Sequence, residues 1–326
     1  MREYKKSSSS FLNFMALLRS TFIALSRNSA LRGFSESSSI GRKMSSRFVA
    51  GLEIEDVLQA AETLNAHGIS ATLDSLGENV ATPDEARRSA EVYHRLLDAI
   101  QQRGLDANIS VKLTQMGLEL DPGIAHDIAA SLVSHAVETK NFVRIDMEGS
   151  ALTQVTLDIV KSVHAAESPA GLNRGHIGVV IQAYLYRSEK DICELLNEGI
   201  RIRLCKGAYQ EPPELAFAAK ADVDSNFVRL MRLLVKSGVY NGIATHDDAM
   251  IEATKQFVRE RKIAASEFEF QMLYGVRRDL QRTLVADGYG MRVYIPFGHE
   301  WYPYFMRRLA ERPANVLFLA KNFFKN

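Results

Sequence analysis

The feature that most restricts the fold of this chain is an alternation of short apolar segments with longer amphipathic ones, which begins near residue 70 and continues to the end. Strands are predicted for eight of the short segments: 71–76, 109–113, 142–147, 177–183, 200–206, 243–246, 268–273 and 291–296. Helices are predicted after them, at about 82–104, 121–139, 151–166, 187–198, 213–237, 247–261, 276–287 and 300–312. This rhythm is typical of βα units that build a parallel sheet.

Eight strands, each followed by a helix, predict an α/β fold of the closed (β/α)8 type, a TIM barrel of ~250 residues. The first helix carries clear start and stop signals, with Thr82 as N-cap, Pro83 at the first helical position, Glu85 in a capping box and Gly104 at the end. An open doubly wound sheet is the structural alternative. No GxGxxG follows the first strand, so the fingerprint of that fold is missing from the sequence.

The predicted barrel domain covers residues 70–326, and residues 1–69 are predicted to form a helical arm and a linker. Residues 11–27 read as an amphipathic helix, too short and too interrupted by Asn13 and Arg19 to cross a bilayer. Packing on the body and contact with a membrane surface are both open for this helix. The last helix is expected to lie over the mouth of the barrel.

Composition narrows the class of partner. The 326 residues include 40 basic and 39 acidic side chains, so a net charge of +1 provides no broad cationic surface for nucleic acid. An apolar content of 46% is ample for a core. The two cysteines form no disulfide framework and lack metal-ligand spacing. We therefore expect a cytoplasmic protein that binds small molecules, and contact with the inner face of the cell membrane stays open.

The segment Ile200–Tyr209 concentrates positive charge on one predicted strand. Apolar residues alternate there with Arg201 and Arg203, and Lys206 and Gly207 follow where the strand should open into a loop. Such a strand end can hold phosphate or carboxylate oxygens, because Arg offers a bidentate fork and Lys a point charge. The alternative interpretation is an edge strand whose charges face water.

Polar residues stand at the ends of nearly all the predicted strands. Active sites of (β/α)8 barrels lie at this carboxyl-terminal end, so these residues become the candidates for function. They are Asp74, Glu78, Lys112, Asp146, Glu148, Gln182, Arg203, Lys206, Thr245, His246, Gln271 and Tyr294. Some of them are expected to be supporting hydrogen-bond partners only.

The last predicted helix carries a second cationic group. Tyr304, Arg307, Arg308 and Glu311 are spaced to share one helical face. Paired arginines backed by an acid and an aromatic ring could clamp a small carboxylate. A solvated face with ion pairs between successive turns is the alternative.

The strand ends also contain residues of two other kinds of site, a metal site and a Schiff-base lysine. His246 with the two aspartates that follow it lacks the separated ligands that a divalent metal site usually uses, so no metal is expected. Lys112 and Lys206 sit where a Schiff-base lysine of an aldolase would sit.

These residues together resemble the proline dehydrogenase family, the flavin-dependent barrels that oxidise L-proline to pyrroline-5-carboxylate. The resemblance is carried, in the order of the family, by residues 72–78, 110–114, 144–148, 181–185, 203–209, 244–247, 268–275, 292–301 and 304–311. It implies hydride transfer from proline C5 to flavin N5 and delivery of the electrons to a membrane quinone. It also implies that a separate pyrroline-5-carboxylate dehydrogenase could receive the product, since the chain resembles the short, monofunctional bacterial form.

The resemblance assigns a role to each matching residue. FAD would be lined by Met147, Gln182, Arg203, Lys206, Gly207, Ala208, Thr245 and His246. Proline would be bound by Lys112, Leu273, Tyr294, Tyr304, Arg307 and Arg308. Asp146 and Arg203 would act nearest the reacting centre, Glu78 would pair with Arg307 as a gate, and Glu311 would steady the arginines. Asp247 departs from the family, which often has Asn there, and would add a negative charge near the phosphate or adenine side of the flavin.

The chemistry of this reaction agrees with the residues present. A flavin performs the difficult step, so the protein mainly positions its ligands and needs no catalytic triad. Two rivals remain: a Schiff-base aldolase that uses Lys112 or Lys206, and a barrel that binds a small ligand without catalysis.

Overall fold

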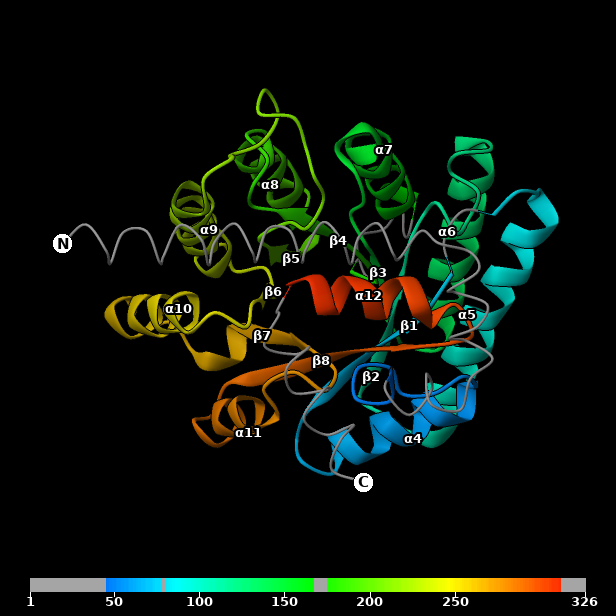
Figure 1. Ribbon diagram of the computed structural model, residues 1–326, viewed down its shortest axis with the longest axis horizontal. Coiled ribbons are helices and arrows are strands. Elements are labelled where there is room, and N and C mark those ends of the chain that lie inside the picture. Colours follow the sequence, from blue (N-terminus) through cyan, green and yellow to red (C-terminus); the bar gives the residue numbers. More distant parts are fainter. Residues whose placement is uncertain (1–44, 78–79, 167–174, 312–326) are drawn as a thin grey trace, which may run out of the picture.

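Eight parallel strands close into a barrel in the computed structural model, which describes residues 45–77, 80–166 and 175–311 (Figure 1). The strands are β1 (Ser70–Ser75), β2 (Ala107–Val111), β3 (Val143–Ile145), β4 (Ile177–Gln182), β5 (Arg201–Cys205), β6 (Asn241–Ala244), β7 (Phe268–Leu273) and β8 (Gly290–Phe297). They neighbour one another in chain order, and β1 closes the ring on β8 through six residue pairs, from Ser70 with Arg292 to Ser75 with Phe297. The prediction of a (β/α)8 barrel is confirmed, and the open sheet is excluded.

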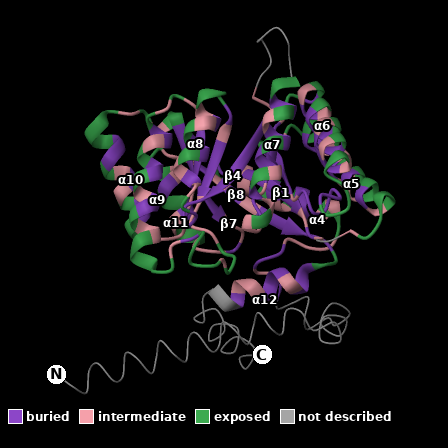
Figure 2. Ribbon diagram, turned by 90° about the horizontal axis from the view of Figure 1, so that it is seen from above, coloured by how far each residue is buried: buried purple, intermediate pink, exposed green. Residues whose placement is uncertain are grey.

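Helices surround the barrel and connect its strands. They are α4 (Ile54–Asn65), α5 (Pro83–Arg103), α6 (Pro122–Glu138), α7 (Ser150–Ala166), α8 (Ser188–Asn197), α9 (Lys220–Val235), α10 (Asp248–Arg261), α11 (Arg278–Ala286) and α12 (Trp301–Glu311), with a short 3₁₀ helix at Ala265–Glu267. Figure 2 shows their inner sides and the strands as buried, and their outer sides as exposed. This division follows from the helical period, which places apolar residues on the face that meets the sheet.

The signals predicted for the first barrel helix are present in α5. Thr82 Oγ1 accepts the Glu85 N–H at 3.3 Å, and the helix ends at Gly104 in the left-handed conformation with φ of 62°. The Glu85 carboxylate accepts the N–H of Ala81 at 2.7 Å, one residue earlier than the capping box expects. The local sequence therefore determines both ends of this helix.

Helix α9 begins later than its apolar pattern predicts, at Lys220 and not near 213. The residues before it instead form a bridge between Ala216 and Leu185, and Phe217 packs edge-on against Tyr186 at 4.6 Å between ring centroids. These contacts join segments that are distant in sequence, so a local pattern could not reveal them.

Helix α4 packs into the main core, although it lies within residues 1–69, which were assigned to an arm and linker. Val57, Leu58 and Ala61 are buried in the same cluster as the barrel strands. The amphipathic helix expected at 11–27 lies outside the described residues. In the described part of the chain, none of the helices combines the length and the apolar character that a membrane span needs.

Helix α12 lies across one end of the barrel, apart from the ring of outer helices (Figures 1 and 2). It starts at Trp301, just after β8 ends at Phe297, so this is the carboxyl-terminal mouth. Trp301 and Phe305 pack there in a second apolar cluster with Phe48 and Leu76. The prediction that the last helix lies over the mouth is confirmed.

Candidate active site

A buried network of charged side chains fills the mouth of the barrel. Lys112 extends from the end of β2, and its Nζ lies 3.2 Å from both carboxylate oxygens of Asp74, 3.4 Å from Asp146 Oδ2 and 3.2 Å from Tyr294 Oη. The three partners stand on β1, beyond the end of β3 and on β8, so only closure of the barrel brings them together. We call these four residues, with Ser110 and Arg203, the mouth network.

Asp146 is the acceptor on which the mouth network converges. Ser110 Oγ donates to its Oδ1 at 2.6 Å, Arg203 Nη1 to the same oxygen at 3.0 Å, and Tyr294 Oη to its Oδ2 at 2.8 Å. Burial alone would raise the pKa of this carboxyl, but Lys112, Arg203 and the hydroxyl donors outweigh it and lower the pKa. Asp146 is therefore a fixed negative charge at neutral pH.

Asp74 has the opposite electrostatic character. Its side chain is 1% exposed, and burial raises its pKa, an effect that Lys112 opposes and the negative charge of Asp146 reinforces. Tyr93 of α5 donates to Asp74 Oδ1 at 3.4 Å. The mouth network therefore contains two aspartates whose environments shift their pKa values in opposite directions.

Lys112 carries a firmly held proton. Burial tends to lower its pKa, but Asp74, Tyr294 and Asp146 together raise it well above its usual value. A Schiff-base lysine must give up this proton to become a nucleophile. The environment of Lys112 is therefore the reverse of what an aldolase requires.

Arg203 links the mouth network to the interior of the barrel. It is 6% exposed, and its Nε donates to Gln271 Oε1 at 2.5 Å, while Gln271 Nε2 donates to Glu269 Oε1 at 2.6 Å. Ile202 and Leu204, on either side of it in β5, face the helices and are fully buried. The predicted alternation of this strand is confirmed, and its interpretation as a solvated edge strand is wrong.

The loop after β5 brings a second cation to the mouth. Lys206 Nζ pairs with Asp224 Oδ1 at 2.5 Å and with Asp247 Oδ2 at 2.7 Å. Asp247 is also the N-cap of α10 and accepts the Ala249 N–H at 3.0 Å. Asp247, which stands where the family often has Asn, thus provides both a helix cap and an ion-pair partner for Lys206.

Gly207 occupies a position that admits no side chain. Its φ is 106°, and a Cβ atom there would lie 2.3 Å from the Tyr184 ring. Glycine is favoured where backbone must turn in this region and pass close to a neighbouring group. Ala208, next in the loop, is exposed.

The remaining residues assigned to the cofactor surround the ends of β3, β4 and β6. Gln182 Nε2 donates to the Glu148 backbone oxygen at 2.9 Å, and Met147 is buried. Thr245 is buried too, and its Oγ1 accepts the Asp247 N–H at 3.1 Å.

His246 and Leu273 meet across β6 and β7. The Leu273 N–H donates to His246 Nε2 at 2.9 Å, so the neutral imidazole carries its proton on Nδ1. This bond fixes the ring at the edge of the mouth.

Helix α12 carries the predicted carboxylate clamp. Tyr304 is buried, and the Arg308 guanidinium carbon lies 5.0 Å from the centroid of its ring. Arg307 is half-buried on the same helix. Glu78 and the side chain of Glu311 lie outside the described residues, so their gate and support roles stay predictions.

Several polar residues inside the barrel are not among the residues predicted from the strand ends. Ser110, Glu269 and Arg292 each stand two residues before a predicted site residue, namely Lys112, Gln271 and Tyr294. A strand period of two places both members of such a pair on the inner face. This i, i+2 spacing of polar residues was the signal that could have found them.

Comparison with known proteins decides the family. The model of the proline dehydrogenase family matches residues 57–321. Proline dehydrogenase 1 of Bacillus subtilis subsp. natto is 41% identical over 310 residues, which cover 95% of this chain and 100% of that protein. The chain belongs to the proline dehydrogenase family. The proline dehydrogenase of Deinococcus radiodurans is 39% identical over 286 residues, 86% of this chain and 90% of that protein.

Solved structures of larger proteins share the fold. Proline utilization A (PutA) from Bdellovibrio bacteriovorus, described as inactivated by N-propargylglycine, has a TM-score of 0.79 at 24% identity, covering 91% of this chain. The match spans only 36% of that protein. A bifunctional PutA protein has a TM-score of 0.71 at 25% identity, covering 86% of this chain and 32% of its own.

Membership in the proline dehydrogenase family assigns a reaction to the chain. The chain is an oxidoreductase of proline catabolism, and its family is flavin-dependent. The lysines predicted for an aldolase are both held in ion pairs with aspartates, which agrees with a positioning role.

Proposed function

We propose that the chain binds FAD at the mouth of its barrel, oxidises L-proline to pyrroline-5-carboxylate and passes the electrons to a membrane quinone. The observation that carries this proposal is the mouth network, in which buried cations and one fixed carboxylate converge in a protein of the proline dehydrogenase family. Bound FAD would supply, at N5, the acceptor for the hydride on proline C5.

The donors present fit an anionic cofactor with a large ring system. Arg203 offers a buried guanidinium, and the close approach at Gly207 leaves the loop backbone against Tyr184 with no side chain in between. Together with Lys206, Ala208, Met147, Gln182, Thr245 and His246, these residues would hold FAD. A phosphate oxygen at Lys206 would share the ammonium with Asp224 and Asp247.

The substrate would be held from two sides. Arg307 and Arg308 would bind the carboxylate of proline from α12, because guanidinium groups offer it paired donors. Lys112, Tyr294, Tyr304 and Leu273 would line the ring. Glu78 would pair with Arg307 as a gate, and Glu311 would orient the arginines.

Asp146 would keep the reacting centre in register. It holds Arg203, Lys112 and Tyr294 at once, so the groups that face cofactor and substrate share one anchor. Placement of reacting groups in this manner is a large part of enzymatic rate enhancement.

The partners beyond proline belong to the same proposal. The acceptor would be a quinone reached from the cytoplasmic side of the membrane, and a separate pyrroline-5-carboxylate dehydrogenase would take the product.

The test is the absorption spectrum of the purified full chain before and after anaerobic addition of L-proline. We expect a flavin spectrum that bleaches, and its recovery when a soluble quinone is added. Bound flavin that proline leaves unchanged would favour a ligand-binding barrel. A colourless protein that borohydride links to its substrate through Lys112 or Lys206 would favour an aldolase.

A further inference from the structure

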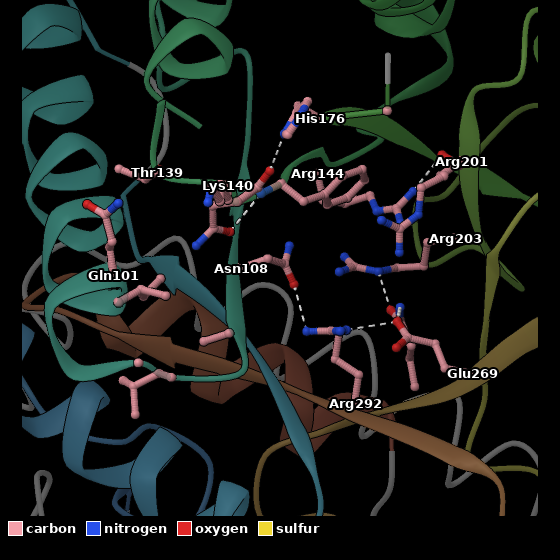
Figure 3. Close-up of a pocket in the computed structure, with 18 residues that line it drawn as sticks. Gln101, Asn108, Thr139, Lys140, Arg144, His176, Arg201, Arg203, Glu269 and Arg292 are labelled. Atoms are coloured by element: carbon pink, nitrogen blue, oxygen red, sulfur yellow. Dashed lines mark hydrogen bonds and ion pairs between the residues drawn. The ribbon is translucent and has the colours of Figure 1, made fainter. Parts of the chain in front are cut away.

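A cavity lies at the opposite end of the barrel from the mouth network. Its volume is about 510 Å³, and it is built where the strands begin and where α5 and α6 end (Figure 3). It is lined by Ile100, Gln101, Gly104, Leu105, Ala107, Asn108, Thr139, Lys140, Asn141, Phe142, Arg144, Gly175, His176, Arg201, Arg203, Glu269, Gln271 and Arg292. We call it the base cavity.

Positive charge dominates the base cavity. Arg144, Arg201, Arg203, Arg292 and Lys140 line it, and Glu269 is the acidic residue among its described lining. Glu269 is already committed to Arg292, whose Nε donates to its Oε1 at 2.8 Å. Arg203 is matched by Asp146 in the mouth network. Among the described side chains, Arg144 and Arg201 form no direct ion pair with a carboxylate, and Glu269 acts on both only from a longer distance.

Arg144 provides the strongest sign of a missing anion. It is 2% exposed, and its Nη1 donates to the backbone oxygens of Arg201 at 2.6 Å and Val179 at 3.2 Å, but its Nε has no partner in the described structure. Burial, and then the nearby Arg203 and Arg201, hold the pKa of this guanidinium well below its usual value. Proteins rarely leave a buried charge in this state unless an opposite charge compensates it.

The guanidinium group of Arg201 is held in place by two aromatic rings and one backbone oxygen. Its guanidinium carbon lies 4.4 Å from the centroid of Phe142 and 4.9 Å from that of Tyr240, and its Nε donates to the Tyr240 backbone oxygen at 3.2 Å. The Arg144 guanidinium carbon lies 4.6 Å from the same Phe142 centroid. The two arginines are thus held by one ring, which fixes their forks without neutralising them.

The partial negative charges at the C-termini of α5 and α6 offset the positive charge of the base cavity only weakly. A helix C-terminus carries partial negative charge, which falls off within its last turn. The terminal carbonyls here are satisfied locally, since Ile100 O accepts the Leu105 N–H at 3.1 Å and Ala136 O accepts the Asn141 N–H at 2.7 Å. A net cationic cavity therefore remains.

We propose that the base cavity is a binding site for a phosphate group, held by Arg144, Arg201 and Lys140. Arginine forks match the oxygens of phosphate, and two fixed guanidinium groups suit a dianion better than a single carboxylate. Ile100, Leu105 and Ala107 supply an apolar wall beside them, so the cavity has room for the carbon part of a small phosphate ester.

The site is separate from the one that proline and flavin would use. Arg203 borders both, but its hydrogen bonds reach Asp146 and Ser110 on the mouth side and Gln271 towards Glu269. The three proposed phosphate ligands belong to β3, to the amino-terminal end of β5 and to the loop before β3. Binding there can therefore be measured without turnover, so its failure would not be confused with failure of the proposed function.

The experiment is calorimetric titration of the purified full chain, with its flavin, after dialysis into phosphate-free buffer of constant ionic strength. Inorganic phosphate is the probe, and sodium chloride at equal ionic strength is the blank. We expect one phosphate per chain. Arg201→Gln should weaken binding about tenfold, the usual effect of losing one charged hydrogen-bond donor.

Two further variants keep the test independent of folding defects. Lys140 is exposed, so Lys140→Gln should fold normally and still weaken phosphate binding. Arg259→Gln removes one positive charge from α10, outside the lining of the base cavity, and should bind phosphate as the wild type does. Stronger binding of glycerol 3-phosphate would assign the site to an ester, and equal binding would assign it to free phosphate.

Absence of phosphate binding to the wild type would overturn the proposal. So would an equal loss of affinity in Arg201→Gln and Arg259→Gln, or an equal response to chloride, because each would reduce the effect to nonspecific charge screening.

Discussion

Asp74 and Asp146 flank the same lysine, but their environments shift their pKa values in opposite directions. Asp146 accepts hydrogen bonds from four side chains, including Arg203 and Lys112, and its pKa is lowered. Asp74 is more deeply buried with fewer donors, and its pKa is raised. Both carboxylates raise the pKa of Lys112, so its ammonium group stays protonated.

This difference predicts opposite effects of pH for two matched variants. A carboxyl with a lowered pKa adds stability above its unfolded value of about 3.9, and that stability is lost as pH falls towards the folded value. Asp146→Asn should cost roughly 3–5 kcal/mol near neutral pH, because it breaks a buried ion pair. The gap in unfolding free energy between wild type and Asp146→Asn should therefore shrink as pH falls below about 4.

Asp74→Asn is the counterpart. Because the folded pKa of Asp74 is raised, its ionisation costs stability as pH rises above about 3.9. The advantage of wild type over Asp74→Asn should be largest at low pH and fall as pH rises. Urea unfolding between pH 3 and 6 measures both slopes, and slopes of the same sign would contradict the assignment.

At the scale of elements, α12 is positioned by its apolar side and not by the arginines it carries. Trp301 and Phe305 pack edge-on at 5.8 Å, and Phe305 meets the ring of Phe48 at 6.3 Å between centroids. Phe48 comes from a segment before the first strand of the barrel. A residue far from the proline site in sequence therefore helps to place the proposed carboxylate clamp.

We expect Phe48→Ala to loosen α12 and raise the KM for proline, because the clamp would lose its fixed position. Truncating a buried phenylalanine should cost about 3–5 kcal/mol of stability. Phe257→Ala, in the buried face of α10, is the matched control and should lower stability with little change in KM. Equal changes in KM for both variants would show that α12 has no special part.

The sequence predicted the positions of the strands and helices better than the contacts between them. All eight strands were located to within a few residues, because each is a short apolar segment that lies between longer amphipathic ones. Helix α4 was missed as part of the barrel, although Val57, Leu58 and Ala61 show helical spacing, since the segment was assigned to the arm. The late start of α9 depends on Tyr184 and Tyr186, which no local pattern connects to it.

For the candidate site, too, the sequence predicted residues better than the contacts between them. Strand-end position was enough to select Lys112, Asp146, Arg203 and Tyr294. It could not say that Asp146 would be the common acceptor, because this depends on closure between β1 and β8. The base cavity was not predicted, because its residues come from the amino-terminal ends of the strands, whereas active sites of (β/α)8 barrels lie at the carboxyl-terminal ends.

At the scale of the whole molecule, the barrel interior is a polar column that runs from the mouth network to the cationic base cavity. Arg203, Gln271, Glu269 and Arg292 follow one another by hydrogen bonds from the mouth network to the base cavity. Gly178 is one position where the column demands the absence of a side chain.

Gly178→Ala should destabilise the whole barrel. A Cβ atom there would lie 2.4 Å from the Arg201 backbone oxygen and 2.6 Å from Arg144 Nη1, so the β4 and β5 strands would have to separate. Overpacking of this kind costs about 1–3 kcal/mol or more. Gly149→Ala, whose Cβ would come no closer than 3.8 Å to Glu211, should stay within about 0.5 kcal/mol of wild type. Thermal unfolding of both variants checks the difference, and equal midpoints would contradict it.

The central claim is that α12 holds proline by its carboxylate over a flavin anchored at the mouth. Stopped-flow reduction of the bound flavin by L-proline, in wild type and in Arg307→Met and Arg308→Met, tests it most directly. We expect both variants to keep their flavin while proline binding weakens by roughly 2–4 kcal/mol, the cost of breaking a buried charge pair. The apparent Kd for proline should then rise by roughly 30- to 700-fold. An unchanged Kd in both variants would contradict the claim.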